Sequence, residues 1–317
     1  MKVIIQIPCY NEAQTLPVVL AALPRELSGI SKVEWLVIDD GSQDGTAEVA
    51  KKNGVDYVIR HTRNLGLARA FMTGLDACVS LGADIIVNTD ADNQYMAADI
   101  PKLIAPIVSG QADIVIGSRP IASISHFSPT KKALQNMGSW LVRRVSNTQV
   151  RDTTSGFRAL GRSAAMQMHV FSEYTYTLET IIQAGQKGMA ITDVPIRINE
   201  QLRPSRLIKN VPDYLRQSVL TILRIFMTYQ PFTFFFIPGA ISIGLGALIG
   251  IRFLYFYFSS TGVTGHIQSL ILVAILLSLG GFLVVTGLIA DLISVNRKLL
   301  ERIDWRLNKT LSEKDKD

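Results

Sequence analysis

The chain has 317 residues, of which 48% are hydrophobic and only 18% charged, and its formal net charge is +6. This length suits about two domains. A charged fraction below the roughly 25% of soluble domains excludes a disordered chain and indicates a membrane protein. The small positive balance fits an anionic lipid surface better than DNA, so no nucleic-acid partner is expected.

Residues 1–203 alternate short runs rich in Val and Ile with helical patterns. The runs are KVIIQIP at 2–8, EWLVIDD at 34–40, VDYVIR at 55–60, ADIIVNTD at 83–90 and ADIVIGS at 112–118. Between the third and fourth runs, Ala68, Phe71, Met72 and Leu75 recur at helical spacing. The pattern predicts an α/β, Rossmann-like domain whose mostly parallel sheet is covered by helices on both faces. In such folds the site lies at the carboxyl ends of the strands.

Residues 204–228 are predicted to form an amphipathic helix in the membrane interface. Its apolar face comprises Val211, Tyr214, Leu215, Ser218, Val219, Ile222, Leu223 and Phe226. The alternative is a surface helix packed on the α/β domain. Residues 229–296 predict a transmembrane hairpin with spans at about 232–256 and 267–291, because each apolar run reaches the roughly 20 residues that cross a bilayer.

Lysines and arginines gather on both sides of this hairpin, whereas residues 259–266 between the spans carry no charge. By the positive-inside rule, both termini and the α/β domain are expected on the cytoplasmic side of the inner membrane, with 297–317 as a cytoplasmic tail. Glycines in the spans would let copies of the chain pack together, so a homo-oligomer is compatible with the sequence. These glycines are Gly244, Gly246, Gly250, Gly280 and Gly281.

Polar side chains follow four of the predicted strands at the point where each ends. The segments are Pro8-Cys9-Tyr10-Asn11-Glu12, 39–46 (DDGSQDGT), 89–94 (TDADNQ) and Gly117-Ser118-Arg119. Each alone is typical of a turn, and Asp44 and Thr46 are interpreted as helix-capping residues. Together, at one edge of a parallel sheet, they predict a binding site.

The 89–94 segment gives the most specific indication of a ligand, a divalent cation. Asp90 and Asp92 flank Ala91, and Gln94 adds an amide oxygen two residues on. Close carboxylates repel one another unless a cation joins them, and oxygen ligands suit Mg²⁺ or Mn²⁺. The sequence has no P-loop and no glycine fingerprint after the first strand, which argues against a P-loop NTPase and a dinucleotide-dependent dehydrogenase.

Six stretches occur in one order along the chain: PCYNE, DDGSQDGT, NLGLARAFMTGL, DADNQ, GSR and DTTSGFRAL. In these residues the chain resembles the GT-A domain of glycosyltransferase family 2. With its C-terminal hairpin it resembles the polyprenyl-phosphate branch, which includes dolichyl-phosphate mannose synthases and bactoprenol glucosyltransferases. The resemblance covers about residues 1–225, and the membrane part is similar only in kind.

The resemblance implies a role for each matching residue. The nucleotide and donor would be bound by Pro8, Tyr10, Glu12, Asp39, Asp40, Asp90 and Ala91. Asp90, Asp92 and Gln94 would hold the metal, Arg119 would lie near the diphosphate or acceptor phosphate, and Asp152 would lie where the acceptor approaches or act as a structural cap. Asp92, Arg119 and Asp152 are the implied catalytic residues.

The chain departs from the family in one motif. Where the family often has Arg-x-x-Gly-x-Ser-Lys, residues 200–206 read EQLRPSR, which keeps cations but not the glycine. Arg203 and Arg206 are still assigned to phosphate binding.

The implied reaction is inverting transfer of a hexose or N-acetylhexosamine from a nucleoside-diphosphate sugar, UDP rather than GDP, to undecaprenyl or dolichyl phosphate. A phosphate monoester with a second pKa of about 6 is already a dianion at neutral pH and needs no strong base. One alternative is a family 2 enzyme acting on a soluble or growing polysaccharide acceptor, although the Gln-x-x-Arg-Trp element of polymer synthases is missing. The other is a membrane anchor that binds nucleotide sugar without catalysis.

Overall fold

The structure is a computed structural model that describes residues 1–120, 140, 142–144, 146, 148–170, 176–199, 220, 223–224, 226–259 and 267–314. The chain divides into two compact units, one of residues 1–218 with 304–317 and the other of residues 219–303. Arg203, Arg206 and most of the predicted interfacial helix lie outside the described residues.

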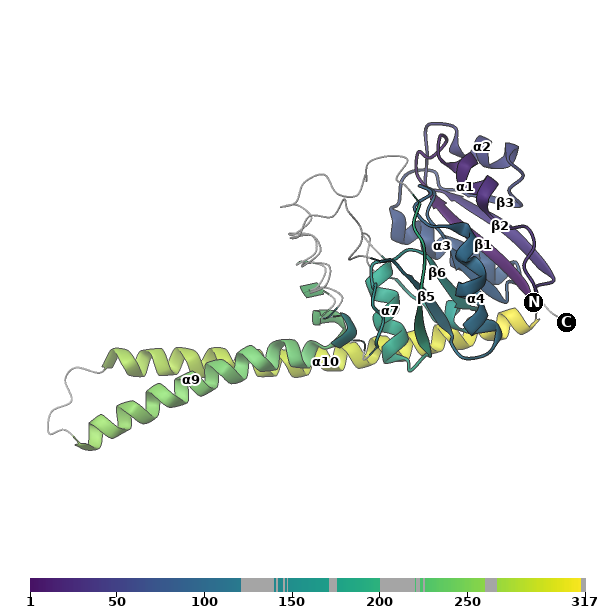
Figure 1. Cartoon of the computed structure of the whole chain (residues 1–317). Coiled ribbons are helices and arrows are strands. Elements are labelled where there is room, and N and C mark those ends of the chain that lie inside the picture. The colour runs from purple at the N-terminus through teal and green to yellow at the C-terminus, as the bar shows by residue number, and fades with distance from the viewer. Residues whose placement is uncertain are drawn as a thin grey trace. The chain divides into compact units, whose positions relative to one another are not determined.

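The first unit contains one seven-stranded sheet (Figure 1). Its strands are β1 (Lys2–Cys9), β2 (Lys32–Asp39), β3 (Tyr57–Arg60), β4 (Ile85–Asn88), β5 (Ile114–Ser118), β6 (Arg158–Gly161) and β7 (Ile191–Pro195). The five predicted runs are β1 to β5. Its described helices are α1 (Leu16–Ala22), α2 (Thr46–Lys52), α3 (Leu67–Ser80), the 3₁₀ turn η1 (Ala97–Asp99), α4 (Ile100–Val108), α6 (Arg162–Ala165) and α7 (Thr177–Gln186).

The strand order is β3-β2-β1-β4-β6-β5-β7, and every neighbouring pair is parallel except those of β6. The predicted mostly parallel sheet is therefore confirmed. Because β6 runs antiparallel, its first residue pairs with the last residue of β4, Arg158 with Asn88. The residues that precede β6 thus reach the same edge as the carboxyl ends of β1, β2, β4 and β5.

Helices cover both faces of the sheet, as predicted. Val3, Ile5 and Ile7 of β1 share a core with residues of α1, α2 and α4. On the other face α3 packs against β1 and β2. A Cβ at Gly74 of α3 would lie 2.5 Å from the Gln6 side-chain oxygen, so glycine permits this close approach. Burial on both faces explains the unbroken apolar runs.

The second unit contains α9 (Pro231–Ser259), and α10 (Ile267–Lys314) begins in it. Both are long and apolar enough to cross a membrane, over Pro231–Ser259 and Gln268–Arg297, and the predicted spans fall on them. Only 17% and 11% of these apolar windows are buried, which differs from the core helices of a soluble protein. Such continuous exposed apolar surface suits lipid contact.

The two helices pack through small residues. The Ser242 hydroxyl donates to the Leu276 carbonyl at 2.8 Å, and a Cβ at Gly239 would lie 3.0 Å from the Gly280 carbonyl oxygen. Two of the glycines predicted to allow self-association, Gly246 and Gly280, lie against the neighbouring helix of the same chain. Gly244 and Gly281 have no atom within 4 Å of an added Cβ.

Candidate active site

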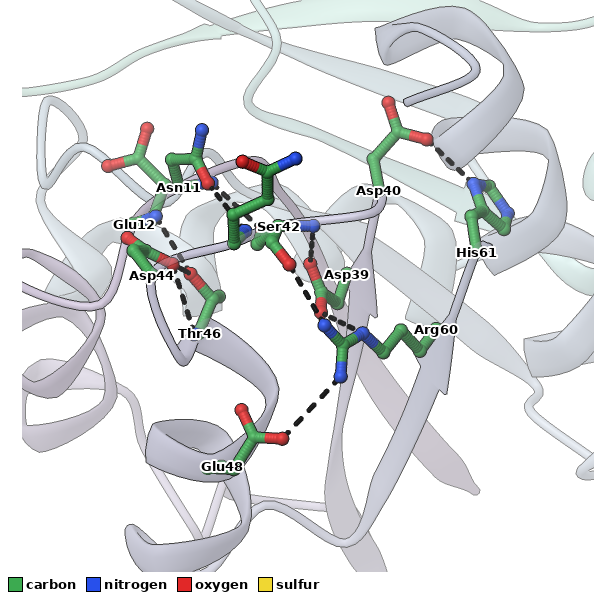
Figure 2. A network of polar contacts seen from close by, with 11 residues as sticks. Asn11, Glu12, Asp39, Asp40, Ser42, Asp44, Thr46, Glu48, Arg60 and His61 are labelled. Carbon is green, nitrogen blue, oxygen red and sulfur yellow. Dashed lines mark hydrogen bonds and ion pairs between the residues drawn. The ribbon is translucent and has the colours of Figure 1, made fainter. Parts of the chain in front are cut away.

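The loops that follow β1 and β2 are braced against each other (Figure 2). The Asn11 backbone N–H donates to the Ser42 hydroxyl, and the Gln43 N–H donates to the Asn11 side chain, each at 2.9 Å. The Glu12 N–H donates to Thr46 Oγ1 at 2.9 Å. Asn11 adopts a left-handed backbone with φ of 55°, which Asn tolerates better than most residues. These hydrogen bonds therefore hold the loops that follow β1 and β2 together as one unit.

Asp39 and Asp40 end β2 inside the protein. Asp39, with no exposed surface, accepts the Ser42 N–H at 2.9 Å and lies 3.2 Å from the Arg60 Nε. Asp40, which is 3% exposed, accepts the backbone N–H groups of Leu65 and Gly66 at 2.9 Å, and one of its oxygens lies 2.7 Å from the His61 ring. Both carboxylates hold the loops around the site in place.

A pocket of about 490 Å³ opens between these loops. Its lining comprises Tyr10, Gly41, Ser42, Gln43, Arg60, His61, Thr62, Arg63 and Asn64. Gly41 has a φ of 73°, and a Cβ there would lie 2.4 Å from the Arg63 backbone, so only glycine fits. Tyr10 is 43% exposed. A neighbouring pocket of about 460 Å³ is lined by residues 11–15 with Gln43 and Asp44, and Asp44 accepts the Thr46 N–H at 3.1 Å.

The acidic turn, residues 90–95, follows β4. Asp90 and Asp92 are half-buried, and Ala91 between them is buried. The Asp92 side chain accepts the Gln94 N–H at 3.0 Å, and Asn93 is left-handed with φ of 59°. Burial and the nearby Asp92 carboxylate raise the pKa of Asp90 to about 7, although Arg119, Arg158 and a hydrogen bond from Tyr95 oppose that shift.

This turn fits a divalent cation. Burial and the Asp92 carboxylate outweigh the nearby arginines in raising the pKa of Asp90, and a cation bound between the two carboxylates would stabilise their ionised forms. A Cβ at Gly156 would lie 2.9 Å from both Asp90 oxygens, so glycine keeps the space beside that carboxylate open. The described residues contain no group of three or more His, Cys, Asp and Glu placed for a metal. Two carboxylates with an amide would leave the other positions to water and substrate phosphate, as Mg²⁺ prefers.

Arg119 and Asp152 form a buried pair beside the turn. Arg119 Nε and Nη2 donate to the two Asp152 oxygens at 2.7 and 3.1 Å, and Nη2 also donates to the Thr154 hydroxyl at 2.8 Å. Burial alone would raise the pKa of Asp152, but the Arg119 charge and hydrogen bonds outweigh it and lower that pKa. The Asp152 side chain has no exposed surface, which favours a structural role over contact with an acceptor.

Sequence reasoning missed two residues of this region. Arg158 is completely buried, donates to the Thr177 carbonyl at 3.3 Å, and lies with its guanidinium 5.1 Å from the Tyr176 ring. Asn199 hydrogen-bonds to the acidic turn. Arg158 stands in the recognised DTTSGFRAL stretch, so its charge could have marked it, whereas nothing in the sequence around Asn199 gives such a signal.

The sequence model of Glycosyl transferase family 2 matches residues 4–170, more than half of the chain. The chain belongs to glycosyltransferase family 2. The UDP-N-acetylglucosamine–dolichyl-phosphate N-acetylglucosaminyltransferase of Methanococcus voltae is 32% identical to this family 2 chain over 216 residues, covering 60% of this chain and 83% of the relative. The undecaprenyl-phosphate mannosyltransferase of Micrococcus luteus is 28% identical over 211 residues, covering 63% and 85%. These relatives confirm the predicted branch.

Solved structures share the fold. Glucosyl-3-phosphoglycerate synthase from Mycobacterium tuberculosis, in complex with Mn²⁺, UDP and glucosyl-3-phosphoglycerate, superposes with a TM-score of 0.54. The sequence identity is 18%, and the match covers 72% of this family 2 chain and 79% of that one. The α/β fold class predicted for the first unit is thereby confirmed.

Proposed function

We propose that the protein is a membrane-bound, inverting glycosyltransferase that moves a hexose or N-acetylhexosamine from a nucleoside-diphosphate sugar to a polyprenyl phosphate. One observation carries the proposal: the acidic turn and Arg119 lie at one sheet edge in a chain that also has two exposed apolar helices. Relatives named for transfer to dolichyl and undecaprenyl phosphate support it.

The pocket beside Tyr10 is the proposed site for the base of the donor. Its lining contains arginines and no carboxylate among the described residues. Uracil has two carbonyl acceptors and a single N3–H donor, whereas the corresponding edge of guanine has one carbonyl acceptor and two donor groups, N1–H and the 2-amino group, which carboxylates commonly accept. This difference favours UDP over GDP. Four buried residues are proposed to support the loops that form the donor site: Pro8, Glu12, Asp39 and Asp40.

Asp90, Asp92 and Gln94 are the proposed ligands of Mg²⁺ or Mn²⁺. Bound there, the ion would neutralise charge that develops on the diphosphate leaving group. Ala91, buried between the aspartates, keeps the turn close to the sheet. Arg119 is proposed to offer Nη1 to a phosphate oxygen, because Asp152 and Thr154 occupy its other nitrogens and fix the plane of the guanidinium.

The acceptor phosphate is proposed to attack the anomeric carbon in line with the departing diphosphate. One carbon–oxygen bond forms, the bond to the diphosphate breaks, and the nucleoside diphosphate leaves with its electron pair. No proton has to be removed from a dianionic phosphate, so Asp152 is not required as a base. Positioning and electrostatic stabilisation by Arg119 and the acidic turn then supply the rate enhancement.

The helices α9 and α10 are proposed to anchor the enzyme where its lipid acceptor lies, with the catalytic unit and both termini on the cytoplasmic side. Arg203 and Arg206 follow Asn199 by four and seven residues and are proposed to bind the acceptor phosphate. Their placement stays a prediction, as does the division into domain, interfacial helix, hairpin and tail.

A donor panel tests the proposal. Full-length protein in detergent is incubated with labelled UDP-glucose, UDP-N-acetylglucosamine or GDP-mannose and undecaprenyl phosphate, with Mg²⁺ or with EDTA. We expect label in the organic phase with a UDP-sugar, loss of that label in EDTA, and loss in Asp92→Asn. Asp84→Asn is the matched control, because Asp84 precedes β4 and accepts the Lys2 N–H. Water-soluble product, or full turnover by Asp92→Asn, would contradict the proposal.

A further inference from the structure

A short segment after β7, residues 196–199, runs along the acidic turn; it is called here the clamp segment. Ile198 pairs with Tyr95 as an antiparallel bridge. The Asn199 N–H donates to the Gln94 carbonyl at 2.9 Å, and the Met96 N–H donates to the Arg197 carbonyl at 3.3 Å. The backbone of the turn is therefore paired with a segment about a hundred residues away in the sequence.

The Asn199 side chain adds a second set of bonds. Its amide nitrogen lies 3.0 Å from the Asn93 carbonyl oxygen and 3.2 Å from the Tyr95 carbonyl oxygen. The same nitrogen lies 3.4 Å from the Asn93 side-chain oxygen. One amide group thus bridges two carbonyls that lie on either side of Gln94.

The turn needs such support because its own conformation is uncommon. Asn93 is left-handed, with φ of 59°. Within the described turn, the Gln94 N–H donates to Asp92 at 3.0 Å and Tyr95 hydrogen-bonds to Asp90, but neither bond holds the peptide groups on either side of Gln94. A flip of either bridged peptide would turn the side chains of Asp92 and Gln94 relative to each other. Those side chains are two of the three proposed metal ligands.

The clamp segment is itself fixed at its other end. The Arg197 N–H donates at 2.7 Å to Asp99, which has no exposed surface, and Arg197 Nη2 donates to the same carboxylate at 2.8 Å. Ile196 is 4% exposed in the core, and its N–H donates to the Ser118 carbonyl at 3.1 Å. The segment is therefore a firm support against which the turn is held.

We propose that Asn199 is a positioning residue for the metal site: its side-chain amide holds the acidic turn in the shape that brings Asp92 and Gln94 to one cation. The inference rests on the proposed function, since it requires a cation at that turn. Hydrogen bonds behind metal ligands commonly change affinity by about 10- to 100-fold. Loss of the Asn199 amide is therefore expected to weaken Mn²⁺ binding by about tenfold.

The test measures Mn²⁺ alone, by the electron paramagnetic resonance signal of the free ion, on full-length protein in detergent. Asn199→Ala removes the bridge, and Asn199→Asp keeps its size but removes its donor. Asn53→Ala is the matched control, because the exposed Asn53 amide also donates to a backbone carbonyl, that of Val49 at 2.8 Å, at the end of α2. Thermal unfolding of each variant is recorded in parallel.

Both Asn199 variants are expected to bind Mn²⁺ about tenfold more weakly, to unfold within a few degrees of Asn53→Ala, and to regain turnover at high Mn²⁺. Wild-type affinity in the Asn199 variants, with binding lost in Asp92→Asn, would overturn the role of Asn199 and leave the proposed function intact. Unchanged Mn²⁺ binding in Asp92→Asn as well would overturn both. A lowered unfolding temperature with unchanged affinity also counts against the proposal.

Discussion

At the scale of single residues, the carboxylates of the candidate site differ in their hydrogen-bond partners and in their surroundings. Asp39, Asp40 and Asp152 are buried and accept hydrogen bonds from loop N–H groups or from Arg119, whereas burial and the nearby Asp92 carboxylate raise the pKa of the half-buried Asp90. The first group shapes loops and orients Arg119. We propose that a metal–diphosphate complex neutralises the charge of Asp90 and Asp92.

The raised pKa of Asp90 gives a pH dependence. With a pKa of about 7 in the metal-free protein, Asp90 binds a proton that competes with the cation. Mn²⁺ affinity is expected to be constant above pH 8 and to fall towards pH 5.5, as measured by calorimetry. The pKa is higher folded than unfolded, so this group should make the metal-free protein less stable as pH rises from about 4 to 7. Affinity independent of pH would contradict this assignment.

The Arg119–Asp152 pair predicts a large loss of stability. Asp152→Ala leaves a buried guanidinium without its partner, which typically costs about 3–5 kcal/mol. Asp193→Ala is the control, because Asp193 also pairs with an arginine, Arg151, that is 75% exposed. That surface pair should contribute less than about 1 kcal/mol. Chemical unfolding of the two variants makes the comparison, and equal losses would argue against a buried pair.

At the scale of elements, the strands that could be predicted are those buried on both faces of the sheet, because burial on both faces requires an unbroken run of apolar residues. The runs of β1, β2, β4 and β5 are of this kind. Nothing comparable marks β6, which has four residues and begins with the charged Arg158. Its antiparallel direction follows from pairing with β4 and β5 and could not be read locally. Asn199 escaped notice for the same reason, since its partners lie about a hundred residues away.

Gly41 tests the close contact between the loops that follow β2 and β3. Gly41 and Gly82 both have positive φ, of 73° and 79°, but an added Cβ at Gly41 meets the Arg63 backbone at 2.4 Å and one at Gly82 meets nothing within 4 Å. Gly82→Ala should therefore cost only about 1 kcal/mol of backbone strain. Gly41→Ala should cost more and weaken UDP binding at least tenfold in a titration. Equal effects of the two substitutions on UDP binding would contradict the pocket assignment.

At the scale of the whole molecule, the chain combines a family 2 transferase unit with two apolar helices whose side chains are largely exposed. The family resemblance could be predicted from six motifs, because the tight turns and the proposed ligand contacts of these segments require particular residue types. The two candidate membrane-spanning helices could be predicted from length and apolarity alone. The sugar could not be predicted, because similar relatives are named for different sugars.

The orientation of the hairpin can be checked by cysteine labelling. The native Cys9 and Cys78 are buried, which raises the pKa of both thiols and keeps them unreactive. Ser109→Cys, at the exposed end of α4, should react with an impermeant maleimide only in inside-out vesicles. Thr261→Cys, between α9 and α10 in the sequence, should react only in right-side-out vesicles. Labelling of both from the same side would contradict a membrane-crossing hairpin.

The most direct measurement is the mass of the lipid formed when purified protein acts on undecaprenyl phosphate and a ¹³C-labelled UDP-sugar in Mn²⁺. A single labelled sugar on a monophosphate, formed with release of UDP and prevented by EDTA, is the predicted result. A diphosphate-linked sugar, or labelled sugar found only in the aqueous phase, would contradict attack of the lipid phosphate on the anomeric carbon.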